Sequence, residues 1–281
     1  MEIRYLAQEE HIKSRALYEE VFAEDDEAFV DAYYKIKAAD NEILAVLDGT
    51  DPIAMLHRNP YTFSFRGTKV HADYLVAVAT RYSYRHQGWM RRLLTKALKD
   101  MEAEKMPFTF LMPADEAIYT PFDFRLMGNV DEESLAALNG AQLAEDYDLY
   151  VEKDADYERR HVFWPEWETT PMMMRLVDAA AFVKLIGASE EQSLVIAIED
   201  PILSGNNGTF LWKFNQEGSS LARAEGKAEL QISIADLGSF LCGMLGAEEL
   251  PGVRQAGNPN ELTEKLNRIK VLDGIYINET V

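Results

Sequence analysis

The chain has 281 residues, of which 47% are hydrophobic and 27% are charged, with a formal net charge of −20 and a single cysteine, Cys242. This composition is typical of a globular protein and excludes a disordered chain, a collagen and a disulfide scaffold. The acidic excess argues against nucleic acid as a partner, because it would repel phosphates. The N-terminus is too polar for a signal peptide and no apolar run spans a bilayer, so we expect a cytoplasmic protein with no membrane partner.

The first part of the chain has the patterns of mixed α and β structure. Alternating apolar residues predict strands at 2–6, 42–47, 52–65, 69–78 and 107–112, with a hairpin at Arg66-Gly67. Helical spacing predicts helices at 11–22, 25–36, 89–105 and 115–119. Pro60 cannot donate a ladder hydrogen bond, so we expect an edge or a bulge at that point of its strand.

The rest of the chain divides into a connector and a second compact unit. Residues 128–168 are rich in Asp and Glu, with Leu135, Leu138 and Leu143 at helical spacing, which predicts a helical connector. Strands are predicted at 172–177, 193–198, 209–214 and 227–234, and a strand-like end at 274–281. Helices are predicted at 179–186, at 237–245 with Asp236 as its cap, and at 260–269. We therefore expect units at 1–127, 128–168 and 169–281.

The segment between the strand that ends at Val78 and the helix that opens at Trp89 has the pattern of an anion site. A helix N-terminus has backbone N–H groups without intrahelical partners, and its dipole adds partial positive charge. Gly88 lets the backbone approach a phosphate closely. The segment is also basic within an acidic chain, through Arg85, Arg91, Arg92, Lys96 and Lys99.

This segment resembles the acetyl-CoA signature of the GCN5-related N-acetyltransferase (GNAT) superfamily, [Gln/Arg]-x-x-Gly-x-[Gly/Ala]. It reads here as Arg85-His86-Gln87-Gly88-Trp89-Met90, with Met90 in place of Gly or Ala. The resemblance implies a mixed, mostly antiparallel sheet with flanking helices and acetyl-CoA as cosubstrate. It also implies that the turn and Arg91 bind the pyrophosphate, and that Val78, Ala79 and Thr80 bind the pantetheine arm on a strand that diverges from its neighbour.

Two further stretches resemble the Eis (enhanced intracellular survival) type of GNAT protein. Ile118-Tyr119-Thr120-Pro121-Phe122-Asp123-Phe124 is similar to the Eis segment Ile-Tyr-x-x-Phe-Gly-[Tyr/Phe], with Asp123 in place of Gly. The region from Pro171 to Glu279 is similar to the sterol-carrier-protein-like α/β domain that ends Eis proteins. The resemblance thus implies an α+β protein of two domains. The connector is too short for the usual central GNAT-like lobe, so that lobe is expected to be absent or reduced.

The Eis resemblance implies two catalytic groups. Tyr119 matches the general acid, and the C-terminal carboxylate, here that of Val281, matches the general base. The alternatives stay open at this point: Tyr119 as an amphipathic core tyrosine, and Val281 as part of a frayed terminus. Asp73 and Glu27 are other candidate bases, and each is expected to be a solvated surface carboxylate.

The implied function is an N-acetyltransferase that moves an acetyl group to a primary amine of an aminoglycoside-like or lysine-type substrate. The alternative is a non-catalytic protein that binds acyl-CoA or a hydrophobic ligand. The five histidines are scattered without metal-ligand spacing, so no metal is expected. Eis proteins are often hexamers, which leaves a homo-oligomer open.

Overall fold

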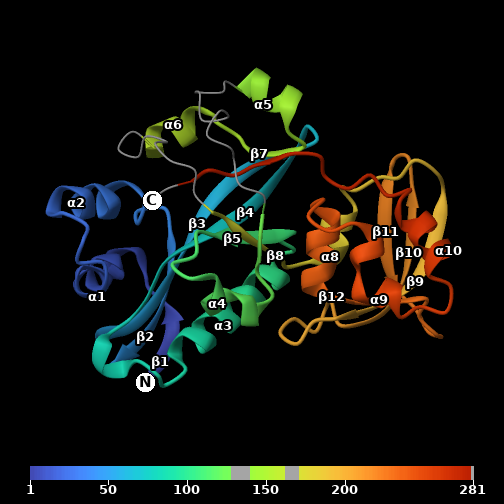
Figure 1. Ribbon diagram of the computed structural model, residues 1–281. Coiled ribbons are helices and arrows are strands. Elements are labelled where there is room, and N and C mark those ends of the chain that lie inside the picture. Colours follow the sequence, from blue (N-terminus) through green and yellow to red (C-terminus); the bar gives the residue numbers. More distant parts are fainter. Residues whose placement is uncertain (128–139, 162–170, 280–281) are drawn as a thin grey trace.

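The computed structural model describes residues 1–127, 140–161 and 171–279. Two units lie side by side, an N-terminal sheet with helices on both faces and a smaller C-terminal unit (Figure 1). Within the described residues, no helix combines the length and apolarity that crossing a bilayer demands.

The first sheet has nine strands, and its main path runs β1-β2-β3-β4-β5-β8-β6. Its strands are β1 (Glu2–Tyr5), β2 (Glu42–Asp48), β3 (Asp51–Phe65), β4 (Thr68–Thr80), β5 (Phe108–Leu111), β6 (Arg125–Leu126), β7 (Leu149–Val151), β8 (Met173–Leu176) and β13 (Ile275–Tyr276). Most pairs are antiparallel, while β4 with β5 and β7 with β13 are parallel. This is the mixed, mostly antiparallel sheet that was predicted.

Alternation along the strands places helices on both faces of this sheet. The helices are α1 (Arg15–Val21), α2 (Glu27–Ile36), α3 (Trp89–Ala103), α4 (Glu116–Tyr119), α5 (Gly140–Asp146) and α6 (Ala155–His161). On β2, Ile43 and Ala45 pack in the core under α1 and α2, whereas Leu44 and Val46 pack in the core under α3. Side chains at successive strand positions point to opposite faces, so one buried strand supports both layers.

Pro60 lies on β3 where that strand has a neighbour on one side only. The β2–β3 pairing ends at Glu42↔Arg58, and β7 pairs with β3 only from Phe63 onward. On the other side, Pro60 pairs with Asp73 of β4. Pro60 O accepts a hydrogen bond from Arg160 Nη1 at 2.8 Å rather than from β4, so the N of Pro60 also faces the open side and costs no ladder hydrogen bond. The predicted local edge is confirmed.

The C-terminal unit is a four-stranded sheet in the order β11-β10-β9-β12, covered by helices. Its elements are α7 (Ala179–Val183), β9 (Gln192–Glu199), β10 (Gly208–Asn215), β11 (Gly218–Arg223), β12 (Leu230–Ser233), α8 (Ile234–Leu241), α9 (Pro251–Arg254) and α10 (Pro259–Leu266). Trp212 is fully buried in it. The predicted cap of α8 is wrong, because the Ser233 hydroxyl accepts the N-terminal hydrogen bond, donated by Asp236 N.

Three segments beyond residue 127 join the first sheet. The strand predicted at 172–177 forms as β8, but it pairs with β5 and β6 rather than with the C-terminal sheet. The acidic connector contributes β7, which pairs with β3, in addition to α5 and α6. The strand-like end of the chain returns to this sheet as β13 and pairs with β7 (Figure 1). Leu135 and Leu138 lie outside the described residues.

Candidate active site

Strands β4 and β5 diverge from each other beyond their only pair, Tyr74↔Phe110. The divergence coincides with a bulge, since β4 uses one residue more than β3 between the pairs His57↔Val76 and Met55↔Ala79. Ala77 has a φ of 51°, a left-handed conformation that is uncommon for alanine. The edge of residues 78–80 that faces β5 therefore has no strand partner. The resemblance implied such an edge for a pantetheine-binding strand.

The turn after β4 exposes the backbone of the predicted anion site. His86 and Gly88 both have left-handed φ values, 61° and 77°. The first helical hydrogen bond of α3 runs from Arg92 N to Gly88 O at 3.2 Å. Residues 85–88 are all exposed. The backbone N–H groups of the first helical turn therefore have no partner within the described ranges, and the N-terminus of a 15-residue helix favours an anion there.

Side chains at the start of α3 pack into the hydrophobic core and against Phe122. The Trp89 side chain is buried, and its Nε1 has no hydrogen-bond partner among the described residues. Met90, which replaces Gly or Ala in the signature, packs against the hydrophobic core and is thereby directed into the protein. The Arg91 guanidinium lies 4.9 Å from the ring centre of Phe122, so the first turn of α3 contacts the segment that follows Tyr119.

Tyr119 is the last residue of α4, which begins where the Asp115 side chain accepts a hydrogen bond from Ala117 N at 2.8 Å. The Tyr119 side chain is 7% exposed, and its hydroxyl has no hydrogen-bond partner in the part of the chain that is described. Burial raises the pKa of Tyr119 to about 12, so the phenol keeps its proton at neutral pH. The Tyr119 hydroxyl thus carries a proton that no described residue binds.

Asp123 stands at a turn position that requires a left-handed residue. Its φ is 64°, a conformation that glycine adopts freely and that aspartate tolerates better than most residues. Asp123 can therefore adopt the turn conformation for which the resembled Eis segment has glycine.

The C-terminal segment reaches the same region from the opposite end of the chain. Val281 lies outside the described residues, so its predicted role stays a prediction. Glu279, two residues earlier, has a fully buried side chain that accepts a hydrogen bond from the Tyr157 hydroxyl at 3.2 Å. Burial raises the pKa of Tyr74, and the neighbouring Glu279 and Tyr119 raise it further. Glu279 is linked to Tyr74, where β4 and β5 diverge, through His161 and Tyr61, whose ring centre lies 6.1 Å from that of Tyr74.

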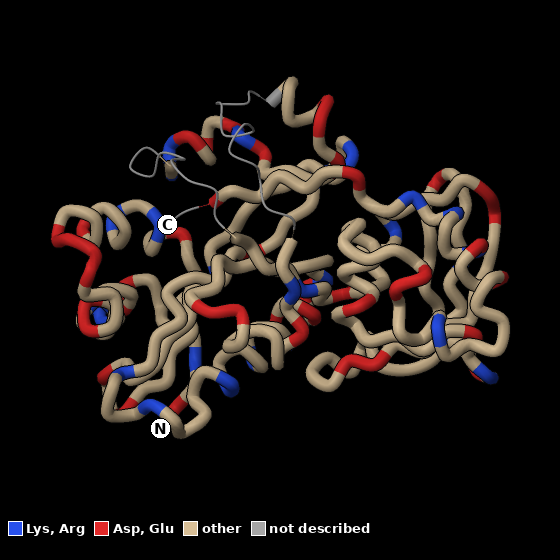
Figure 2. Tube along the Cα trace, viewed as in Figure 1, with Lys and Arg blue, Asp and Glu red and all other residues tan. Residues whose placement is uncertain are grey.

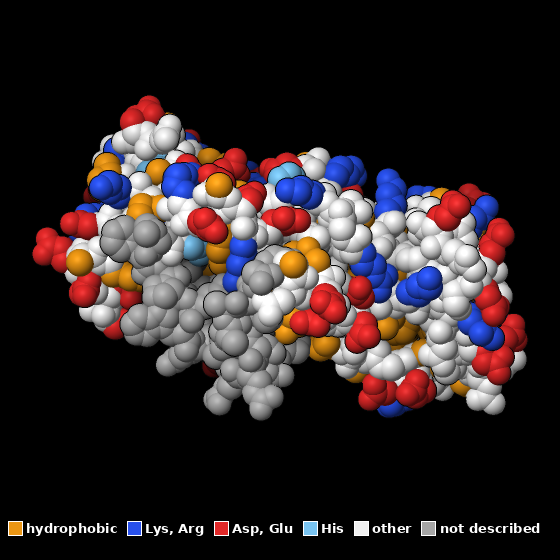
Figure 3. All heavy atoms as spheres, turned by 90° about the horizontal axis from the view of Figure 1, so that it is seen from above, with side chains coloured by type: hydrophobic (Ala, Val, Ile, Leu, Met, Phe, Trp, Pro, Cys, Tyr) orange, Lys and Arg blue, Asp and Glu red, His pale blue; other side chains and the backbone are white. Residues whose placement is uncertain are grey.

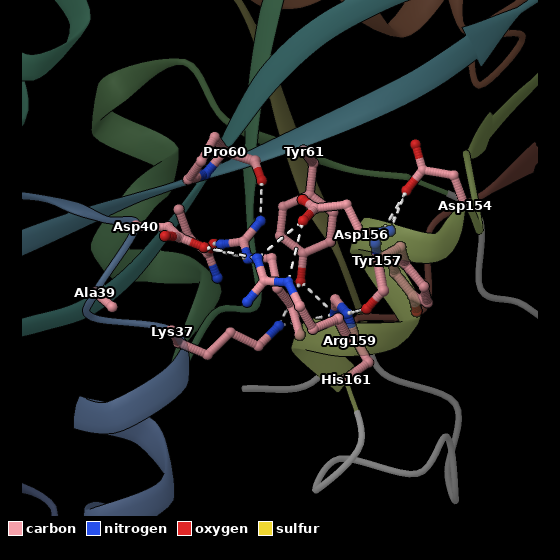
Figure 4. Close-up of polar contacts among 12 residues, drawn as sticks. Lys37, Ala39, Asp40, Pro60, Tyr61, Asp154, Asp156, Tyr157, Arg159 and His161 are labelled. Atoms are coloured by element: carbon pink, nitrogen blue, oxygen red, sulfur yellow. Dashed lines mark hydrogen bonds and ion pairs between the residues drawn. The ribbon is translucent and has the colours of Figure 1, made fainter.

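A buried polar cluster surrounds Glu279. Lys37 and Tyr61 point toward His161 from the end of α2 and from β3 (Figure 4). His161 Nε2 lies 2.8 Å from Lys37 Nζ, 2.9 Å from Tyr61 Oη and 3.2 Å from Glu279 Oε2. Its Nδ1 lies 2.8 Å from the Tyr157 carbonyl, to which it donates. Burial lowers the pKa of Lys37 to about 7.

Sequence reasoning missed this cluster, because its members come from four separate parts of the chain. The only local signal was the strand-like pattern of residues 274–281.

The expectation for Asp73 was wrong: it is 7% exposed and accepts a hydrogen bond from Arg58 Nε at 2.7 Å. Glu27 is exposed, as expected. Among the described residues, no three His, Cys, Asp or Glu side chains gather as a metal site.

Comparison with family models assigns both units. Residues 2–127 match the acetyltransferase (GNAT) domain, and residues 176–271 match the sterol carrier protein domain. The chain carries an N-terminal GNAT domain and a C-terminal sterol carrier protein domain. The turn at Gly88, the divergence of β4 from β5 and Tyr119 all lie within the GNAT domain. No curated protein matches the chain.

Solved structures share the fold of the GNAT and sterol carrier protein domains together. A probable N-acyltransferase from Enterococcus faecalis matches with a TM-score of 0.75 and 12% identity, over 98% of this chain and 99% of the other. A GCN5-related N-acetyltransferase from Kribbella flavida matches with a TM-score of 0.72 and 14% identity, over the whole of both chains. Eis1 from Mycobacterium abscessus matches with a TM-score of 0.62 and 12% identity, over 100% and 99%. At such identities the likeness concerns the fold.

Proposed function

We propose that the GNAT domain is an Eis-type N-acetyltransferase, which moves the acetyl group of acetyl-CoA to a primary amine of an aminoglycoside-like or lysine-type substrate. We also propose that residues 128–168 are a reduced form of the Eis central lobe. One observation carries the proposal: the exposed backbone of the Gly88 turn, the divergence of β4 from β5 and a Tyr119 hydroxyl without a partner among the described residues occur together. Contact between Arg91 and Phe122 joins the first to the last.

The reaction needs three events at the diverging strands. The amine nitrogen attacks the thioester carbonyl, which forms a tetrahedral intermediate, and free backbone N–H groups of β4 stabilise the developing oxyanion. Collapse of the intermediate breaks the C–S bond. Tyr119 gives its proton to the departing thiolate, and the nitrogen gives its proton to a base.

The C-terminal carboxylate of Val281 is the proposed base. The buried position of Glu279 supports this role, because its contacts with Tyr157 and His161 of α6 fix the chain two residues before Val281. A terminal carboxylate has an ordinary pKa of roughly 3.5, so burial or neighbouring groups must raise that value for effective catalysis.

The charge of the molecule fits a cationic acceptor. Acidic residues are distributed over both units (Figure 2), and on the face in Figure 3 their side chains are interspersed with those of lysine and arginine. With a net charge of −20, the overall field attracts polyamines to the surface and raises their encounter rate. The effect weakens with ionic strength, as screening requires.

The test is thiol release from acetyl-CoA with a panel of primary amines, comprising an aminoglycoside, a polyamine and a lysine peptide. Tyr119→Phe should lower kcat by about 100-fold or more, because it removes the general acid. The matched control is Tyr34→Phe, which also removes a tyrosine hydroxyl, here from a half-buried residue whose hydroxyl bonds to Ser14. Its kcat should stay within about twofold of the unmodified protein.

The role of Val281 is tested by adding two glycines after it. The added residues displace the terminal carboxylate, so kcat should fall, whereas two glycines before Met1 should have no effect. Unchanged rates for both Tyr119→Phe and the C-terminal extension would refute the two assigned roles. Binding of acetyl-CoA without thiol release for any amine would favour the non-catalytic alternative.

A further inference from the structure

Arg175 is a buried arginine that bonds to residues of both domains. It lies on β8, and its side chain is fully buried. Two of its nitrogens bond to backbone carbonyls, Nε to Phe122 O at 2.7 Å and Nη1 to Leu176 O at 2.6 Å. The third, Nη2, donates to Asp200 Oδ1 at 2.8 Å. All three nitrogens of the guanidinium are therefore engaged.

The bond to Phe122 holds the turn that follows Tyr119. Phe122 comes three residues after Tyr119 and closes the short helical turn 120–122. Its carbonyl accepts a hydrogen bond from Arg175, and its ring is covered by Arg91 of α3. The segment bearing Tyr119 is thus held by α3 through Arg91 and by β8 through Arg175.

The bond to Asp200 anchors Arg175 in the sterol carrier protein domain. Asp200 follows β9, and its side chain is also fully buried. Besides Arg175, its carboxylate accepts hydrogen bonds from Ile202 N at 3.0 Å, Leu203 N at 2.9 Å and Asn206 Nδ2 at 2.9 Å. A carboxylate held by three further donors is a rigid attachment point, so Arg175 cannot shift without breaking a satisfied buried network.

Asp123 adds a second carboxylate beside Arg175. Its Oδ2 lies 3.9 Å from Arg175 Nη2 and is buried without a hydrogen-bond partner among the described residues. Burial raises the pKa of Asp123, while Arg175 acts in the opposite direction. The cation therefore also compensates the residue that takes the family's glycine position in this turn.

We propose that Arg175, held by Asp200, is a positioning residue for Tyr119, so that the sterol carrier protein domain is a required part of the acetyl-transfer site. The inference rests on the proposed role of Tyr119 as general acid. In this inference the C-terminal domain supports catalysis by anchoring Arg175, without binding a ligand itself. A small displacement of a catalytic group lowers kcat steeply, while coenzyme binding at the Gly88 turn is left intact.

The test is a double-mutant cycle on the full chain with Arg175→Lys and Tyr119→Phe. Lysine keeps the charge but cannot bond to Phe122 and Asp200 with the fixed geometry of a guanidinium. In the otherwise unmodified protein, Arg175→Lys should lower kcat by about tenfold or more and leave the KM for acetyl-CoA within about twofold. In the Tyr119→Phe background it should lower kcat no further.

Active protein is counted by calorimetric titration with CoA, so that a loss of folded protein is not read as a loss of kcat. Asp200→Asn serves as a second variant, because it disturbs the anchor without touching the Tyr119 segment, and it should reproduce the loss of kcat. The matched control is Arg268→Lys, which alters an exposed ion pair with Glu190 in the same domain. That control should retain full kcat per CoA-binding site.

Two results would overturn the proposal. One is an unchanged kcat per CoA-binding site in Arg175→Lys and Asp200→Asn, which would leave Arg175 a purely structural residue. The other is a loss that multiplies with that of Tyr119→Phe, which would show that Arg175 acts independently of Tyr119. If Tyr119→Phe alone has no effect, the proposed function fails instead, and the two failures are distinguished by the single variants.

Discussion

Lys37 shows how a single buried group makes stability depend on pH. Burial lowers the pKa of Lys37 from its ordinary 10.5 to about 7. Between these values the unfolded chain binds more protons than the folded protein, so the free energy of unfolding should rise with pH. Below pH 7 both states are protonated and this dependence vanishes. The slope for one proton is at most about 1.4 kcal/mol per pH unit.

Lys37→Met should remove this contribution while keeping an apolar stem of similar length. We expect the unfolding free energy of the unmodified protein to rise relative to that of Lys37→Met as pH increases from 7 to 9.5. Urea denaturation measures both values. Lys35→Met, at an exposed position of the same helix, is the control and should follow the unmodified protein. Parallel pH curves for Lys37→Met and the unmodified protein would contradict the assignment.

At the scale of elements, the turn between β4 and α3 depends on the backbone of Gly88. A Cβ at Gly88 would meet no atom within 4 Å, so a substitution there acts through the positive φ alone. Gly88→Val should raise the KM for acetyl-CoA by about tenfold, because a β-branched residue moves the turn out of the left-handed region at about 1–2 kcal/mol. Thiol-release kinetics over a range of acetyl-CoA concentrations measure it.

Two further substitutions sharpen this test. Gly88→Asn should be milder, because asparagine tolerates a positive φ. Gly257→Ala is the control, since its Cβ also meets no atom within 4 Å and its φ is not positive. Equal KM values for the asparagine and valine variants would show that backbone conformation at Gly88 does not govern coenzyme binding.

The same elements show what the sequence predicts and what it cannot. The strand at β8 was predicted in the correct place, because its apolar run is a local signal, but its sheet was not, because strand pairing joins distant segments. β7 was missed within acidic surroundings, since it forms by occupying the edge of β3 that β2 leaves free. The turn at Gly88 and the short helix that ends at Tyr119 were predictable from the sequence, while the roles of these residues stay predictions. The φ of Ala77 and the neighbours of Lys37 were not, because they depend on the folded neighbourhood.

At the scale of the whole molecule, the first sheet is completed by residues that lie outside the GNAT family match. β5 and β6 both pair with β8, and β3 pairs with β7. One hydrophobic core runs through both units and includes Phe108 of β5, Met174 of β8 and Trp212 of β10. The two domains therefore share a core, and we expect the full chain to unfold in a single transition.

Expression of residues 1–127 alone tests this view. Without β8, the buried strand β5 exposes an apolar edge and β6 loses its partner, so the fragment should lack cooperative thermal unfolding and should aggregate. Co-expression with residues 128–281 supplies β7, β8 and β13 in trans and should restore a soluble complex, which is the control for expression itself. A soluble fragment 1–127 with a sharp melting transition would show instead that the GNAT domain folds alone. In that case the shared core would be an interface between independent domains, and calorimetry of the full chain should resolve two transitions.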